Sequence, residues 1–397
     1  MNDIYIDADY YQIKKNGEAI SGDVILLSRD RIKHQIVCTL SDGLGSGIKA
    51  NVIASMASHM AHNFCFSPVG IIKGSEITMN TLPVCKERGL GYSTFTLADI
   101  RFSSLKDNTV RIVEYDNPQF LFFNKSEQKQ IDREKITLNR SLAFKKEILY
   151  ESNIVLDIDD RVIIFSDGIT QSGLGTNHPL GFRREGVAAF VAKEIKKNPD
   201  ISSRSLSKAL ALKAASLDND KPKDDITVLV IHARHPRKTL FVSGPPYTMD
   251  NDIKLKKKIE NFDGKIIVAG GTTSKIVSRV LNREMKADLS CVSKDIPPTF
   301  TMEGIDIVSE GMLTLNAVLK VLEEKLSVTA LKENAVKKIS RLLLDSDQIH
   351  FIIGTKLNEA HQDPSIPFDI GIRRTIVNRI IKALDENFMK LTTIEYL

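Results

Sequence analysis

The sequence predicts an α+β domain at residues 1–235, followed by a smaller α/β domain at residues 238–397. The first observation is a series of short β-branched runs, separated by turns, in the first half of the chain. The second is that helical patterns cluster in two places instead of alternating with the strands. The third is a change to alternating strand and helix patterns after residue 238, which is typical of a largely parallel sheet.

Each expected element of the first domain has a local signal. Two strands flank the Lys-Asn-Gly-Glu turn at 15–18, and a third strand at 34–43 ends in Ser-Asp-Gly. Apolar residues at helical spacing predict a helix at 47–64, and its glycine-rich start suits a helix N-terminus. A second helix is expected within 75–85, where Pro83 interrupts its end. The remaining strands are expected at 92–102, 109–116, 119–125, 161–168 and 224–233, and two further helices at 184–197 and 203–217.

The second domain begins after a short basic linker at 235–238 that contains Pro236. Its strand and helix patterns alternate, and its glycine-rich loops follow apolar strands. Strands are expected at 239–246, 264–273 and 348–357, and helices at 252–262, 274–281, 306–326, 335–345 and 372–384.

Composition excludes several classes of protein. The formal net charge is only +5, with 55 Lys and Arg residues against 50 Asp and Glu residues, so no nucleic-acid partner is expected. The N-terminus lacks the apolar region of a secretory signal peptide. No apolar run approaches the roughly 18 residues that span a bilayer, so no membrane partner is expected. We therefore expect a cytoplasmic protein, and a homodimer is compatible with the sequence.

Aspartates recur at the ends of the expected strands. Asp42 and Asp167 each end an apolar run within the tripeptide Ser-Asp-Gly, whereas Asp23 and Asp224 precede such runs. Carboxylate and carbonyl oxygens without nearby Cys or His ligands select Mg²⁺ or Mn²⁺. Two such ions that share a carboxylate favour phosphoryl chemistry. The residues alone thus predict hydrolysis of a phosphomonoester.

These segments resemble the metal-dependent protein phosphatases (PPM type, protein phosphatase 2C-like), and specifically their bacterial SpoIIE-like branch. The pattern of that branch runs SGD, then DGxGxG opening a helix, then FSDG, then Asp-Asp followed by Ile or Met, Thr and Val. All four elements occur here in this order. The resemblance implies a PPM-type β-sandwich of two antiparallel sheets flanked by helices. It also implies a protein serine/threonine phosphatase that uses two Mn²⁺ or Mg²⁺ ions and acts on a phosphorylated protein.

The resemblance also implies a role for each acidic residue. The Asp42 carboxylate would bridge two ions, one of which the Gly43 carbonyl would also bind, and Asp167 and Asp224 would ligate the other. Asp23 would act directly or through a metal-bound water. Asp42, Asp167 and Asp224 are thus the expected catalytic residues, whereas Asp225 stands where many members have Asn. Leu44 follows Asp-Gly where many eukaryotic relatives have His, so the general acid is unassigned, and so is the phosphate clamp.

The second domain contains two glycine and hydroxyl loops after expected strands. Gly270, Gly271, Thr272 and Thr273 form a candidate anion site at a helix N-terminus. A second candidate ligand site comprises Gly354 and Thr355, with Glu359, His361 and Asp363 in the loop beyond. A strand-to-helix turn explains the first set of residues equally well.

Three interpretations follow. The favoured one is a phosphatase that the second domain regulates or supplies with substrate. The first alternative is a catalytically idle binding module whose metal site serves as a switch. The second is a bifunctional protein whose second domain binds a small anionic ligand.

Overall fold

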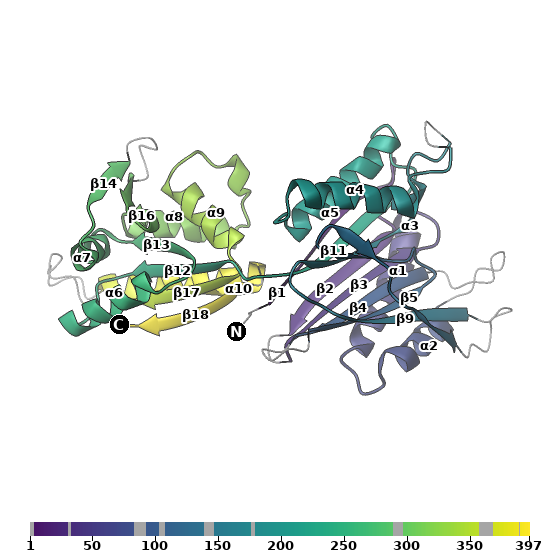
Figure 1. The fold of residues 1–397 in the computed structure, drawn as a ribbon, viewed down its shortest axis with the longest axis horizontal. Coiled ribbons are helices and arrows are strands. Elements are labelled where there is room, and N and C mark those ends of the chain that lie inside the picture. Colours follow the sequence, from purple (N-terminus) through teal and green to yellow (C-terminus); the bar gives the residue numbers. More distant parts are fainter. Residues whose placement is uncertain are drawn as a thin grey trace. The chain divides into compact units, whose positions relative to one another are not determined.

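The computed structural model describes residues 4–30, 33–82, 93–102, 108–138, 147–175, 179–288, 297–356, 368–388 and 390–397. The chain divides into two compact units, Met1–His235 (unit 1) and Pro236–Leu397 (unit 2). Figure 1 shows both units with their elements labelled. Among the helices of the described ranges, none combines the length and the apolar character needed to cross a bilayer.

Unit 1 contains two antiparallel sheets in its described residues. One has the strand order β1-β11-β10-β6-β7 and the other has the order β2-β3-β4-β5-β9-β8. The strands of the first sheet are β1 (Tyr5–Ile13), β6 (Leu121–Asn124), β7 (Glu127–Lys129), β10 (Asp160–Phe165) and β11 (Ile226–Arg234). Those of the second are β2 (Asp23–Asp30), β3 (Gln35–Gly43), β4 (Ser93–Arg101), β5 (Thr109–Tyr115), β8 (Glu134–Leu138) and β9 (Glu147–Val155).

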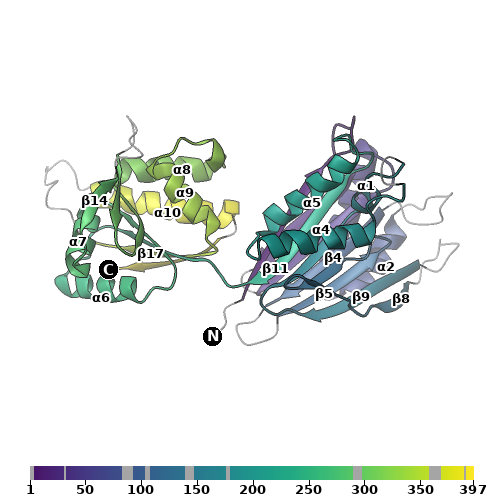
Figure 2. The same ribbon diagram turned by 45° about the horizontal axis from the view of Figure 1, so that its top comes forward.

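The two sheets pack face to face between two layers of helices. Leu229 and Ile231 of β11 contact the inner face of the other sheet, in a cluster that includes Leu40. The alternate residues Val228 and Val230 face outward and pack beneath α4 (Arg183–Lys197) and α5 (Ser203–Leu217). On the far side, α1 (Gly47–Phe64) and α2 (Ile71–Thr81) cover the second sheet. Figure 2 shows α4 and α5 beside β11 and α2 beside β4 and β5. The predicted α+β sandwich is confirmed.

Unit 2 is built on a sheet of order β14-β15-β16-β13-β12-β17-β18. The five neighbouring strands β16, β13, β12, β17 and β18 are parallel to one another. At one edge of the sheet, β14 and β15 pair antiparallel. The strands are β12 (Lys238–Ser243), β13 (Lys265–Ala269), β14 (Met285–Asp288), β15 (Thr299–Met302), β16 (Ile305–Ser309), β17 (Gln348–Ile353) and β18 (Leu391–Tyr396). The helices are α6 (Met249–Glu260), α7 (Gly271–Leu281), α8 (Met312–Glu323), α9 (Ala335–Asp345) and α10 (Phe368–Phe388).

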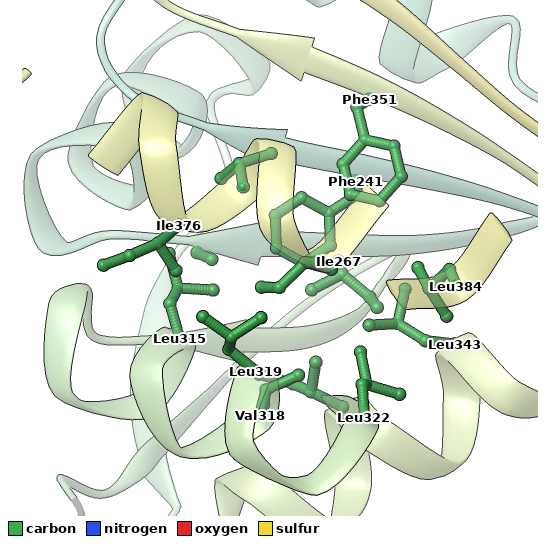
Figure 3. Packing of buried hydrophobic residues seen from close by; sticks show 14 of the residues in the cluster. Phe241, Ile267, Leu315, Val318, Leu319, Leu322, Leu343, Phe351, Ile376 and Leu384 are labelled. Carbon is green, nitrogen blue, oxygen red and sulfur yellow. The ribbon is translucent and has the colours of Figure 1, made fainter. Parts of the chain in front are cut away.

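Helices cover both faces of this sheet. Leu255 of α6 and Val277 of α7 pack on one face with Val268 and Val308. On the opposite face, α8, α9 and α10 enclose a larger core around Phe241, and Figure 3 shows its side chains converging between the helices and the sheet. Unit 2 therefore has hydrophobic cores of its own.

Two expected helices differ from the observed ones. The segment 306–326, expected to be one helix, contains the strand β16, and the helix α8 begins only at Met312. The apolar run at its start fits a buried strand as well as a helix, and Gly311 separates the two elements. Helix α2 begins at Ile71, earlier than expected, and ends before Leu82, which is extended because a proline follows it.

Candidate active site

The register of two neighbouring strands brings Asp23 and Asp42 together. Strand β2 pairs with β3, and Asp23 lies directly opposite Asp42. The Cβ atoms of directly opposed residues in an antiparallel pair are about 4.5–5.5 Å apart, so these side chains share one face of the sheet. Asp23 is buried, whereas Asp42 is half-buried. The pair therefore forms a site whose Asp42 side remains accessible to solvent.

Asp167 and Asp224 approach each other at the edge of the other sheet. Asp167 is the first residue of α3 (Asp167–Gln171), which follows β10 after Ser166. Asp224 lies just before β11, the neighbour of β10. A Cβ added at Gly168 would lie 2.1 Å from the carbonyl oxygen of Asp225 and 3.5 Å from the Cβ of Asp224. The two loops are thus in direct backbone contact, and only glycine fits at position 168.

Hydrogen bonds join the two sheets at this point. The Thr227 hydroxyl of β11 donates to the Asp23 carboxylate over 2.6 Å. The side-chain amide of Gln12 donates to the backbone carbonyl of Asp23 over 3.1 Å and to the Thr227 hydroxyl over 3.0 Å. The sequence interpretation assigned no role to Thr227 or Gln12, although Thr227 belongs to the Asp-Asp-Ile-Thr-Val motif. These bonds hold Asp23 against Thr227 of β11, three residues beyond Asp224.

The carboxylates of the site repel one another. Burial, together with the negative charges of Asp23, Asp167, Asp224 and Asp225, raises the pKa of Asp42 to about 9. Burial also raises the pKa of Asp23 to about 7, with Asp225 and Asp167 contributing and the Thr227 hydrogen bond opposing the rise. Ionising all of these carboxyl groups is therefore unfavourable without a counter-ion, and a bound cation would relieve the repulsion.

The donor set fits a hard divalent cation. In the part of the chain that the structure describes, no three or more His, Cys, Asp or Glu side chains are grouped so that they could hold a metal ion. Mg²⁺, however, usually keeps several waters and binds proteins through one or two carboxylates. Each of the two aspartate pairs supplies two carboxylates. The candidate ligand residues therefore suit Mg²⁺ or Mn²⁺, with water completing the coordination.

Asp225 holds backbone groups of the β1–β2 loop. Its side chain is buried, and its two oxygens accept hydrogen bonds from the Lys15 amide over 2.9 Å and from the Gly22 amide over 2.8 Å. Gly22 directly precedes Asp23. Asp225 is thus a positioning residue that fixes the entry into β2.

Asp225→Ala is expected to lower the free energy of unfolding by about 2 kcal/mol, because the buried Gly22 amide and the half-buried Lys15 amide lose a charged acceptor. Asp224→Ala is the matched control, since the Asp224 side chain is half-buried and accepts the amide of its own neighbour, Asp225. Urea unfolding of both variants measures the difference. Equal losses would contradict the positioning role.

The loop from Asp42 into α1 depends on close backbone contacts. A Cβ added at Gly43 would lie 2.1 Å from the Ala50 carbonyl oxygen, so helix α1 presses directly on this position. The Ser46 hydroxyl donates to the Glu18 carboxylate over 2.7 Å, and a Cβ at Gly47 would lie 2.4 Å from the same carboxylate. Glu18 therefore places a negative charge at the N-terminus of α1, where the helix dipole favours it. In the sequence Glu18 was only a turn residue.

The remaining candidate residues belong to unit 2. Gly270 to Thr273 lie at the junction of β13 and α7, and Gly354 and Thr355 follow β17. His361 lies outside the described residues, as do its neighbours Glu359 and Asp363.

Comparison with protein families gives one match in sequence. The family model described as stage II sporulation protein E (SpoIIE) matches residues 33–234. A comparison with curated proteins finds no match.

Solved structures resemble the chain at low sequence identity. The phosphatase domain of the cell fate determinant SpoIIE from Bacillus subtilis is 17% identical with a TM-score of 0.41, over 59% of this chain and 95% of that domain. The RsbU and RsbW domains of a Mycobacterium tuberculosis protein are 16% identical with a TM-score of 0.44, over 65% of this chain and 67% of theirs. RsbX in complex with magnesium is 19% identical with a TM-score of 0.40, over 59% of this chain and 100% of its own.

Proposed function

Because the chain belongs to the stage II sporulation protein E (SpoIIE) family, we propose that unit 1 is a metal-dependent phosphatase. Its substrate would be phosphoserine or phosphothreonine on a partner protein. The observation that carries the proposal is that Asp23 lies opposite Asp42 and the loops of Asp167 and Asp224 touch, with the Thr227–Asp23 hydrogen bond joining the two sheets. Unit 2 would regulate the activity or recruit the substrate.

The ions would be held by oxygen ligands from both sheets. Asp42 would bridge them, the Gly43 carbonyl and Asp23 would complete the ligands from β2 and β3, and Asp167 and Asp224 would contribute from the other sheet. When bound, two such ions lower the pKa of a water molecule and neutralise the phosphoryl oxygens. No side-chain nucleophile is needed for this reaction.

The chain's own contribution is to hold these carboxylates in orientation. The Thr227 hydroxyl donates a hydrogen bond to one carboxylate oxygen of Asp23. The side-chain amide of Gln171 donates to one carboxylate oxygen of Asp167 over 2.7 Å. The Asp225 amide donates to one oxygen of Asp224 over 2.9 Å. Such outer contacts fix ligand geometry, and losing one typically costs 10- to about 100-fold in metal affinity or activity.

The test is hydrolysis of p-nitrophenyl phosphate and of phosphoserine, phosphothreonine and phosphotyrosine peptides by the full chain. We expect turnover of the first three substrates with Mn²⁺ or Mg²⁺, none in excess EDTA, and recovery when the metal is restored. The phosphotyrosine peptide is the specificity control. A well-folded protein that binds Mn²⁺ but hydrolyses none of these substrates would be the idle binding module instead.

A further inference from the structure

The parallel strands of unit 2 place several loops at one edge of its sheet. Strands β16, β13, β12, β17 and β18 are adjacent and run in the same direction, so their carboxyl ends share that edge. The chain order reverses at β12, since β13 and β16 lie on one side of it and β17 and β18 on the other. In open α/β sheets, ligands bind outside the carboxyl ends of the strands, near such a reversal.

Backbone contacts fill the position between β12 and β17. A Cβ added at Gly354 would lie 2.2 Å from the Pro245 carbonyl oxygen, and the Lys356 amide donates to the same oxygen over 3.1 Å. Both the amide and the hydroxyl of Thr355 donate to the Leu397 carbonyl. The groups of Gly354 and Thr355 are thus engaged within the chain.

The helix that follows β12 is also unsuited to an anion. The Thr248 side chain caps α6 by accepting the Asn251 amide, and the first turn contains Asp250 and Asp252. The dipole of α6 is therefore already matched by acidic side chains.

At the carboxyl ends of β13 and β16, unlike at that of β12, the following helices begin without a side-chain cap. The Gly270 amide donates to the Ser309 carbonyl over 2.8 Å, and a Cβ added at Gly311 would lie 3.8 Å from the Gly270 Cα. Helix α7 begins after Gly270 and α8 after Gly311, and neither has a side-chain cap or an acidic residue in its first turn. Because α7 and α8 cover opposite faces of the sheet, two uncapped N-termini flank one position at its edge.

Buried hydroxyls at this edge lack hydrogen bonds. Ser309 is 1% exposed and Thr314, in the first turn of α8, is fully buried, and neither hydroxyl has a partner. Among the described residues of unit 2, two of the three such hydroxyls lie here, and the third is Ser340 in α9. Ser309 is the last residue of β16, and strand alternation places it on the face of Ile307, beneath α8. Unpaired buried hydroxyls are costly, which indicates that a ligand supplies their partner.

We propose that unit 2 binds a phosphate group, free or part of a small molecule, between the N-termini of α7 and α8. The amides of Gly271 in α7 and of Met312 and Leu313 in α8 would donate to it, because the first amides of a helix have no intrahelical acceptors. The Ser309 and Thr314 hydroxyls would complete the set. Glu310, which lies between β16 and α8, is exposed and can turn toward solvent. The proposal does not rest on the activity of unit 1.

Isothermal titration of the full chain with inorganic phosphate and with AMP tests this site. Excess EDTA is present throughout, so that metal-assisted phosphate binding in unit 1 does not contribute. The decisive variant is Gly271→Asp, with Gly271→Ala as its control. A Cβ at Gly271 meets no atom within 4 Å, and Asp in the first turn favours a helix, so the substitution should not reduce stability. We expect Gly271→Asp to bind phosphate at least about tenfold more weakly than Gly271→Ala, a difference of about 1.4 kcal/mol.

A second comparison uses the buried hydroxyls. Ser309→Ala and Ser340→Ala each remove one unpartnered hydroxyl, so neither should lower the melting temperature, yet only Ser309→Ala should weaken phosphate binding. Tighter binding of AMP than of phosphate would identify a phosphorylated small molecule as the ligand, and equal or weaker binding would identify free phosphate. If the wild type binds neither, or if Gly271→Asp binds as tightly as Gly271→Ala, the site does not exist.

Discussion

Asp42→Asn is expected to reduce hydrolysis of p-nitrophenyl phosphate at least about a thousandfold in the presence of Mn²⁺. The substitution keeps the shape of the side chain but removes the charge that would be shared by two cations. Metal ions contribute several kcal/mol to stabilising charge in the transition state, and each 1.36 kcal/mol corresponds to about a factor of ten in rate. Steady-state kinetics over a range of Mn²⁺ concentrations measures this effect.

The same substitution should not destabilise the metal-free protein. The pKa of Asp42 is raised to about 9 in the folded state, well above its ordinary value of 3.8. A carboxyl group whose folded pKa is raised favours folding when protonated, and its stabilising contribution is lost as the pH rises from the unfolded value toward the folded one. Asn cannot ionise, so in EDTA the unfolding free energy of Asp42→Asn should fall less between pH 5 and pH 8 than that of the wild type.

These two measurements separate catalysis from folding. Loss of turnover together with unchanged or higher stability identifies Asp42 as a functional residue, which is the usual exchange between activity and stability at a charged site. Ser28→Ala is a suitable control. Ser28 lies on β2, but its hydroxyl forms a hydrogen bond with the His62 ring and not with the aspartates. Wild-type turnover by Asp42→Asn would refute the proposed centre.

The sequence predicted the strands that carry the candidate ligands because their signals are local. Asp42 and Asp167 end apolar runs in Ser-Asp-Gly, and the observed strands β3 and β10 end one residue after Asp42 and two residues before Asp167. The register that sets Asp23 opposite Asp42 was not predicted, because strand signals alone do not fix which residues of two strands lie opposite each other. The family was identified for the same reason, because its motifs are short and fall on the edges of strands.

Elements with weak local signals were missed. Strand β7 is exposed along its whole length, and the edge strand β18 of unit 2 has only half-exposed and exposed residues, so neither shows a buried alternating face. Strand β16 was assigned to a helix because its apolar run is too short to show a period. These segments become strands through pairing with neighbours, which is a long-range property.

Side-chain contacts between distant segments were also beyond the sequence. Thr227 and Asp23 are joined across 204 positions, and Asp225 reaches back to Gly22 across 203. Nothing in the local pattern around Glu18 indicates that it lies at the N-terminus of α1. The sequence therefore supplied the candidate groups of the proposed site, whereas the contacts that orient them depend on how the two sheets meet.

Phe351→Ala is expected to lower the free energy of unfolding of unit 2 by about 3 to 5 kcal/mol, the usual cost of removing a buried phenyl group. Phe351 is fully buried on β17, and its ring centroid lies 5.1 Å from that of Phe241 in the core shown in Figure 3. Phe351→Leu retains most of the apolar volume and should cost less than about 1.5 kcal/mol. Urea unfolding followed by circular dichroism compares the two variants.

The effect on hydrolysis is the more informative part of this experiment. The candidate metal ligands Asp23, Asp42, Asp167 and Asp224 all lie in unit 1, and the described residues that form the hydrophobic clusters around its sheets belong to unit 1 as well. At a urea concentration that unfolds unit 2 of Phe351→Ala but leaves unit 1 folded, turnover of p-nitrophenyl phosphate should persist, because its catalytic groups do not depend on the lost core. If turnover and the unit 2 transition instead disappear together, the second unit is required for catalysis itself, and its proposed role as regulator or recruiter is wrong.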